Sequence, residues 1–158
     1  MIEKVEIKNL KVAEHLSEGS LAFTASIWIN GKKAGDAKNN GRGGNNDVDL
    51  WKRKGEQVRR NNKLHDELKE YVKQFTWESL DGKQTPYRVD FYIDRLVDDE
   101  YVRQQVKRWC RTKTVFRIPG KTYEEGEYEL MKKKFTKEVA KGLRILHGKD
   151  VLILNETL

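Results

Sequence analysis

The sequence has almost no cysteine and no long apolar segment, and both scarcities argue against whole classes of protein. Its one cysteine, Cys110, cannot form an internal disulfide, which argues against an oxidised secreted scaffold. No apolar run approaches the roughly 20 residues that a membrane span needs. The first residues lead straight into an alternating pattern without the features of a signal peptide. We therefore expect a cytoplasmic protein with no membrane partner.

Apolar residues are also few for a soluble domain and charged residues many, at 37% and 36% of the 158 residues. The length fits a single domain, predicted to span residues 1–158, which buries about 70% of the surface that its unfolded chain exposes. Four tryptophans, six tyrosines and five phenylalanines argue against disorder, because disordered segments are poor in aromatic residues. The net charge of +7 indicates either an anionic partner or a generally basic solvent-exposed surface.

The N-terminal part of the chain has the pattern of an antiparallel sheet. Residues 2–12 alternate between apolar and polar side chains and predict a strand. Residues 21–29 are rich in β-branched and aromatic side chains, which favour a second strand. Asn30-Gly31 then favours a type I′ turn, in which both central residues have positive φ. Residues 32–38 are the predicted return strand, so the sequence predicts a β-hairpin here.

An Asn/Gly-rich segment, residues 39–46, follows this hairpin and is the most distinctive stretch of the chain. Its glycines permit left-handed backbone conformations, in which successive N–H groups converge to bind an anion. Arg42 has the forked geometry that binds a phosphate or a carboxylate. We predict that Asn46 or Asp47 caps a helix whose positive end adds to this site. The candidate ligand-binding residues are Asn39, Asn40, Gly41, Arg42, Gly43, Gly44, Asn45, Asn46, Lys52 and Arg53.

Helical periodicity characterises the middle of the chain. Apolar residues from Leu64 to Phe75 recur at helical spacing and predict an amphipathic helix over residues 63–75. Residues 86–111 fit two patterns, because residues 87–93 alternate like a strand while the same apolar residues also share one helical face. Thr85 as a cap and Pro86 at the first helical position favour the helix.

The predicted second helix has an irregular apolar face. Five residues separate Val97 from Val102, which rotates the apolar face by about 140° at 3.6 residues per turn. This offset predicts either a bend near Asp98-Asp99 or burial of the helix on two sides.

The C-terminal part combines short strands with one helix. Residues 114–118 predict a strand, and residues 128–135 predict a partner that pairs back onto it. Thr136 caps a predicted helix that ends at Gly148, and residues 151–154 form a last strand. The sequence therefore predicts an α+β fold, in which an antiparallel sheet with an N-terminal β-hairpin packs against two or three helices.

The sequence gives little support for a catalytic site or a metal site. His15, His65 and His147 have no Cys or His at ligand spacing. Asp90, Asp94 and Asp98 fall on one helical face, which fits a solvated acidic stripe better than a cation site. Cys110 follows an apolar face and is interpreted as a buried, inert thiol. The chain also lacks the phosphate-binding motifs of nucleotide enzymes, so we expect no catalytic residue, no metal and no cofactor.

Two groups of basic residues suggest an alternative partner. One group follows the Asn/Gly-rich segment, and the other lies at a spacing of four on the predicted second helix, with Lys132-Lys133-Lys134 adding more charge. Such stripes bind phosphate backbones, although acidic residues are interspersed with them here. The candidate nucleic-acid contacts are Arg59, Arg60, Arg103, Lys107, Arg108 and Arg111.

The segments Ile29-Asn30-Gly31-Lys32 and Asn39-Asn40-Gly41-Arg42-Gly43-Gly44 resemble a motif of small uncharacterised bacterial and bacteriophage proteins. Those proteins show a strand, an Asn-Gly-Lys turn, a second strand and an Asn-Asp-Gly-x-Gly-Gly loop, and Leu154-Asn155-Glu156 is similar to their ends. Asn40 stands where that motif has Asp. The resemblance implies a phage or mobile-element setting, in which small proteins counter host defence by sequestering nucleotide signals or blocking a host protein.

The sequence therefore predicts a non-enzymatic binding protein that captures a phosphate-bearing ligand, such as a nucleotide signal. The first alternative is a nucleic-acid-binding accessory protein. The second is an inhibitor that contacts a host defence protein through exposed Trp28, Trp51 or Trp77, because aromatic residues are enriched at interaction hot spots.

Overall fold

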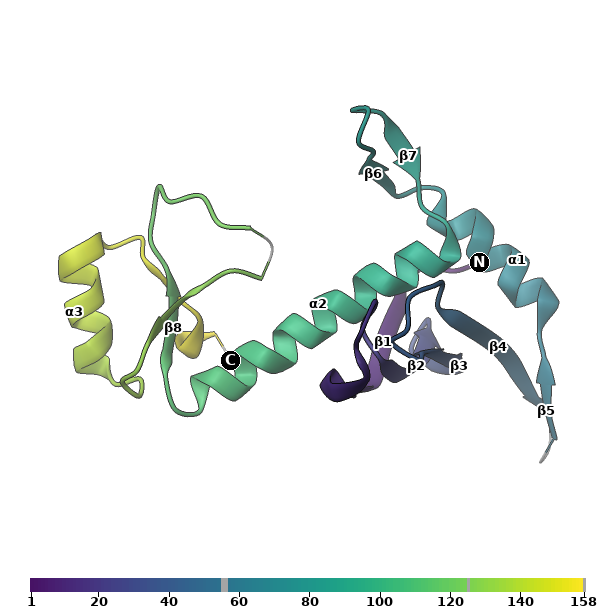
Figure 1. Cartoon of the computed structure of the whole chain (residues 1–158), viewed down its shortest axis with the longest axis horizontal. Coiled ribbons are helices and arrows are strands. Elements are labelled where there is room, and N and C mark those ends of the chain that lie inside the picture. The colour runs from purple at the N-terminus through teal and green to yellow at the C-terminus, as the bar shows by residue number, and fades with distance from the viewer. Residues whose placement is uncertain (55–56, 125, 158) are drawn as a thin grey trace. The chain divides into compact units, whose positions relative to one another are not determined.

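The computed structural model describes residues 1–54, 57–124 and 126–157, without the side chains at positions 53, 54 and 58. The chain forms two compact units, Met1–Glu100 and Tyr101–Leu158 (Figure 1). The boundary between them lies inside helix α2 (Val89–Cys110). That the two units fold together as a single domain of residues 1–158 stays a prediction.

The first unit is built on a five-stranded antiparallel sheet in which every strand pairs with its neighbour in sequence. The predicted α+β class and the N-terminal β-hairpin are confirmed. The strands are β1 (Val5–Val12), β2 (Phe23–Ile29), β3 (Lys32–Asn39), β4 (Asp47–Lys54) and β5 (Gln57–Arg60).

The turn between β2 and β3 has the predicted geometry. Asn30 and Gly31 have φ values of 50° and 76°, and Ile29 pairs with Lys32 on either side of them. Residues on one face of β2 are buried, with Ile27 fully inaccessible to solvent. Alternating burial therefore fixes the register of this hairpin.

Two helices supply the rest of the core of the first unit. Helix α1 (Asn62–Val72) begins at a cap in which Asn61 Oδ1 accepts a hydrogen bond of 3.1 Å from the backbone N–H of Leu64. The predicted amphipathic helix is thus confirmed, although it ends at Val72 rather than at Phe75. The side chains with almost no exposure are Ile27 and Leu50 from the sheet, Leu68 and Val72 from α1, and Ile93 and Val97 from α2.

A small hairpin precedes α2 and projects from the first unit (Figure 1). It consists of β6 (Thr76–Glu78) and β7 (Gln84–Pro86). The prediction that Thr85 caps α2 and that Pro86 opens it was therefore wrong. The pairing of Thr76 with Pro86 holds this segment extended, and α2 begins only at Val89.

Helix α2 resolves the two alternatives for residues 86–95, because the chain is helical from Val89 onward. Its first half, in the first unit, buries Ile93 and Val97. Its second half, in the second unit, buries Val106. The rotation of the apolar face between Val97 and Val102 thus falls where α2 passes from the first unit to the second, and each half of the helix buries apolar residues in its own unit.

The second unit packs a three-stranded sheet, in the order β10-β8-β9, against helix α3 (Lys137–His147). The strands are β8 (Thr114–Arg117), β9 (Glu129–Met131) and β10 (Leu152–Ile153), and all pairs are antiparallel. Phe116 and Ile153 of the sheet share a buried cluster with Val139 and Leu143 of α3. The predicted cap of α3 is confirmed, because Thr136 Oγ1 accepts a 3.2 Å hydrogen bond from the N–H of Val139.

Asn155, in the closing 3₁₀ turn (Leu154–Glu156), joins three segments of the second unit. Its Oδ1 accepts from the N–H of Val115 at 2.8 Å, and its Nδ2 donates to the carbonyls of Cys110 at 3.2 Å and Lys113 at 2.9 Å. The side chain therefore ties the end of α2 to the start of β8.

Candidate functional site

The Asn/Gly-rich segment connects two strands of the sheet. Asp47 is the first residue of β4 and pairs with Lys38, so the predicted helix beginning near Asp47 is wrong. Leu50 is only 2% exposed and lies opposite Gly35. Burial of this apolar side chain and the backbone pairing outweigh the local tendency of Asn46 or Asp47 to cap a helix. The loop therefore has no helix N-terminus to attract an anion.

The loop is held together by its own side chains and by Ser20. Asn39 Oδ1 accepts hydrogen bonds from Ser20 Oγ at 2.8 Å and from the N–H of Gly41 at 2.9 Å. The N–H of Arg42 donates to Asn40 Oδ1 at 3.1 Å, and the N–H of Gly43 donates to Ser20 Oγ at 3.2 Å. Three N–H groups that were predicted to converge on an anion therefore already have acceptors within the protein.

The loop also anchors its neighbours. The carbonyl of Gly41 accepts from the N–H groups of Glu18 and Gly19, both at 2.8 Å. Asn46 Nδ2 donates to the carbonyl of Asp90 at 3.3 Å and to Asp94 Oδ1 at 3.2 Å, at the start of α2. Structural contacts within the protein therefore explain the presence of much of the Asn and Gly in this loop.

A cavity of about 600 Å³ lies beside the loop. Arg42 and Asn40 line it from the loop and Lys11 from β1, Leu16 and Phe23 add apolar surface, and Glu18 adds an acidic side chain. Two cations beside an apolar surface suit a ligand with an anionic group. The structure thus brings Arg42 together with Lys11, which the sequence did not single out, whereas Asn45 and Lys52 do not line this cavity.

The basic run after the loop lies on β4 and β5 rather than on a helix. Lys52 pairs with Arg59 and Trp51 pairs with Arg60 across these two strands. Lys52, Arg59 and Arg60 are exposed, and Arg60 Nε lies 3.8 Å from Asp49 Oδ1. The side chain of Arg53 lies outside the described part of the chain.

The second basic group extends further than the helical spacing suggested. Thr114 pairs with Met131, and Thr114 Oγ1 donates to the carbonyl of Lys133 at 2.8 Å. This hydrogen bond places the segment after β9 beside the turn that follows α2. We call the resulting set of side chains the cationic corner; it comprises Lys107, Arg108, Arg111, Lys113, Lys132, Lys133 and Lys134.

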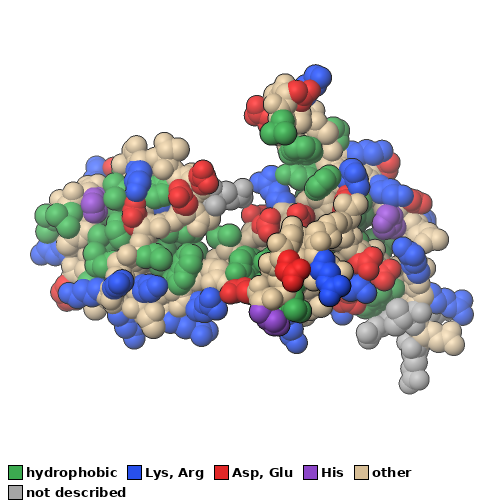
Figure 2. Space-filling view, in the orientation of Figure 1, with side chains coloured by type: hydrophobic (Ala, Val, Ile, Leu, Met, Phe, Trp, Pro, Cys, Tyr) green, Lys and Arg blue, Asp and Glu red, His purple; other side chains and the backbone are tan. Residues whose placement is uncertain are grey.

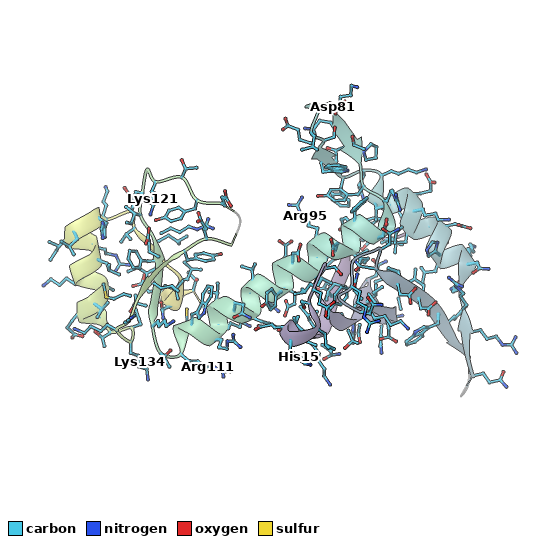
Figure 3. The ribbon with its side chains drawn as sticks, viewed as in Figure 1. His15, Asp81, Arg95, Arg111, Lys121 and Lys134 are labelled. Carbon is cyan, nitrogen blue, oxygen red and sulfur yellow. The ribbon has the colours of Figure 1, made fainter. Side chains whose placement is uncertain are left out.

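The cationic corner has a strong local charge. None of its members forms an ion pair with the residues that the structure describes. Lysine and arginine side chains gather along the lower edge of the second unit, where Arg111 and Lys134 lie (Figures 2 and 3). The pKa of the nearby Glu138 is lowered first by a hydrogen bond from its own N–H, then by Thr136, and also by the charge of Lys133.

Arg103 and Lys107 were predicted to share a stripe with Arg111. All three are exposed, with Arg103 and Lys107 on the second half of α2 and Arg111 in the turn just after it. Arg103 has other interaction partners and is not counted in the cationic corner. The sequence signal that identifies the corner is a pair of basic runs, one just before the predicted strand of residues 114–118 and the other near the end of its predicted partner, residues 128–135.

The three tryptophans of the first unit differ as contact residues. Trp77 is 39% exposed and lies 6.3 Å, between ring centroids, from the exposed ring of Phe91. Trp28 and Trp51 lie on the sheet and are partly buried, with the amines of Lys8 and Lys33 4.2 Å and 5.2 Å from their ring centroids. Among the three, Trp77 is therefore the most accessible to a protein partner.

The reactive groups that the sequence singled out have the following surroundings. Burial raises the pKa of the Cys110 thiol, which disfavours the nucleophilic thiolate. Asp90 forms an ion pair of 2.8 Å with Arg88, and Asp94 accepts from Asn46. No cluster of three or more His, Cys, Asp or Glu side chains suited to a metal ion occurs among the described residues.

No protein-family model matches the chain, and comparisons with curated proteins and with solved structures give no significant match. Within the described residues, every helix is too short or too polar to span a bilayer. The candidate site therefore rests on geometry and charge alone.

Proposed function

We propose that this protein binds nucleic acid and that the cationic corner contacts the phosphate backbone. The observation that carries the proposal is the gathering of seven cations without an ion pair among the described residues. Like charges held close together repel one another, so the arrangement does not serve the stability of the second unit. A phosphate backbone removes this repulsion and releases condensed counterions.

Two chain segments supply the charges, which favours an extended polyanion. The end of α2 contributes Arg108, the turn after it contributes Arg111, and the residues after β9 contribute the run Lys132–Lys134. Both are fixed to the same strand, β8, through Asn155 and through Thr114. A surface held in place in this way can follow successive phosphates, whereas a single phosphate needs fewer cations.

Salt dependence tests the proposal. Binding of fluorescein-labelled oligonucleotides is measured by anisotropy between about 50 and 200 mM salt. Over this range the affinity of a protein that binds several phosphates falls by orders of magnitude. Replacing Lys132, Lys133 and Lys134 together by glutamine is expected to reduce the slope of log affinity against log salt by about 1 for each phosphate that is no longer bound.

A matched control removes three lysines elsewhere. Lys69, Lys73 and Lys83 form ion pairs with Asp66, Glu70 and Asp81 in the first unit. Their triple replacement by glutamine changes the net charge equally and is expected to leave the slope nearly unchanged. Absence of binding by the wild type, or an equal effect of both triple variants, contradicts the proposal.

A second candidate function is supported by the cavity beside the loop. Its volume of about 600 Å³ and its two cations, Lys11 and Arg42, suit capture of a nucleotide or another phosphate-bearing molecule. A phage counter-defence role belongs to this candidate. Isothermal titration against a panel of nucleotides tests it, and Arg42→Ala is expected to abolish the heat, whereas Lys32→Ala, outside the cavity, is expected to retain it. Equal heats from both variants contradict the assignment.

A further inference from the structure

Strand β4 changes its partner halfway along its length. In the described backbone pairing, Asp47 to Leu50 pair with β3, and Trp51 to Lys54 pair with β5. The second half of β4 and β5 therefore form a two-stranded ribbon that extends from the other strands of the sheet (Figure 1). Isolated two-stranded ribbons are marginally stable in water, so this one depends on its attachment to the sheet.

The charges on the ribbon weaken it further. Lys52 lies directly opposite Arg59, and like charges in a cross-strand pair are destabilising. Neither side chain has an ion pair among the described residues, although Arg59 donates to Gln57 Oε1 at 3.2 Å. Between residues 51 and 60 the sequence carries five cations and one acid. An anion bound to this ribbon would offset the repulsion between Lys52 and Arg59.

One face of the ribbon carries side chains of the types that hydrogen-bond to base edges in DNA. Because successive residues of a strand point to opposite faces, Lys52, Gln57 and Arg59 share one side. Arginine and lysine donate to guanine O6 and N7, and glutamine pairs with adenine in the major groove. The hydrogen bond from Arg59 to Gln57 links two of these side chains.

We propose that this ribbon enters the major groove of duplex DNA and that Lys52, Gln57 and Arg59 face the bases. The inference rests on the proposed nucleic-acid binding and adds to it a class of ligand. The major groove of B-form DNA is about 12 Å wide and admits a two-stranded ribbon. The major groove of A-form RNA is deep and narrow and excludes protein side chains. The ribbon therefore selects duplex DNA over duplex RNA, whereas the cationic corner does not discriminate between them.

The test compares the double variant Lys52→Gln/Arg59→Gln with Lys69→Gln/Lys73→Gln, called the α1 variant, which removes the same charge from α1 and from the residue that caps its C-terminus. Each is titrated with one sequence as duplex DNA, duplex RNA and single-stranded DNA, at equal salt. The ribbon variant is expected to lose at least about tenfold more affinity for duplex DNA than for duplex RNA. The α1 variant is expected to retain the preference of the wild type. Methylation of guanine N7 in the duplex is expected to weaken the wild type and not the ribbon variant.

Three results overturn the inference while leaving nucleic-acid binding intact. They are an equal loss for all three ligands, no loss at all, and a lower urea midpoint of the free ribbon variant, which assigns the two cations to folding. Relief of the Lys52–Arg59 repulsion instead predicts a midpoint at or above that of the wild type. If the wild type binds none of the three ligands, the proposed function itself is refuted together with this inference.

Discussion

Replacement of Gly41 by alanine tests whether the Asn/Gly-rich loop is a structural element. A Cβ atom at this position would lie 2.1 Å from the carbonyl oxygen of Leu16 and 2.8 Å from Cβ of Ala22. The φ of Gly41 is +82°, a value that L-residues rarely adopt. Backbone atoms cannot give way as the end of a side chain can, so the backbone segments at Leu16 and at Gly41 must move apart.

Gly43 provides a matched control, because its φ is also +82° but a Cβ atom added there would meet no atom within 4 Å. The backbone strain of about 1–2 kcal/mol is therefore common to Gly41→Ala and Gly43→Ala. Overpacking adds about 1–3 kcal/mol at Gly41 alone. Weakening of the hydrogen bonds from Glu18 and Gly19 to the Gly41 carbonyl adds about 1 kcal/mol each. We expect Gly41→Ala to cost at least about 2 kcal/mol more than Gly43→Ala.

Urea denaturation followed by circular dichroism measures this difference. With an m value of about 2 kcal/mol/M, the midpoint of Gly41→Ala is expected to fall at least about 1 M below that of Gly43→Ala. Hydrogen exchange at the amides of Glu18 and Gly19 reports the same event locally, and both amides are expected to lose protection only in Gly41→Ala. Equal midpoints and equal protection in the two variants would refute the role of the loop as an anchor.

Three further predictions concern single side chains. Asn155→Ala removes hydrogen bonds to Val115, Cys110 and Lys113. It is expected to destabilise the second unit by about 2–4 kcal/mol, measured by thermal denaturation. Asn155→Asp keeps only the acceptor and is expected to restore part of this lost stability. Thr136→Ala removes the cap of α3 and is expected to cost about 1 kcal/mol, and no change in the urea midpoint would contradict the cap. Burial, reinforced by Tyr71, raises the pKa of Tyr92, so its phenol ionises near its ordinary pKa of 10.0 only after unfolding. The stability of the first unit is therefore full below pH 10 and declines as the pH rises above it, and Tyr92→Phe is expected to reduce this decline in urea midpoints measured across that range.

Elements whose ends are set by neighbouring residues could be predicted from the sequence. The Asn30-Gly31 turn, the apolar face of α1 and the Thr136 cap of α3 are all local signals, and the structure confirms each of them. The α+β class followed from these elements because few other arrangements bury their apolar faces.

Elements that depend on distant partners could not be predicted. A helix was expected to begin near Asp47, but residues 47–54 form a strand in which Asp47 to Leu50 pair with β3. Pro86 was expected to open α2, and it ends a strand that pairs with Thr76. In both cases the deciding interaction is a pairing with another strand, which the local pattern around Asp47 or Pro86 does not reveal.

The sequence by itself determined which residues carry charge, where the hairpin turns and which helices are capped, because these depend on side-chain chemistry within a few positions. Only the tertiary structure decided how those charges are used. In the folded protein, N–H groups of the Asn/Gly-rich loop donate to the side chains of Asn39, Asn40 and Ser20. The fold also brings Lys132–Lys134 beside the segment that follows α2, through the hydrogen bond from Thr114 of β8. The physical reason is that hydrogen bonds and cross-strand pairs between remote segments determine which polar groups are satisfied internally and which stay exposed to a partner.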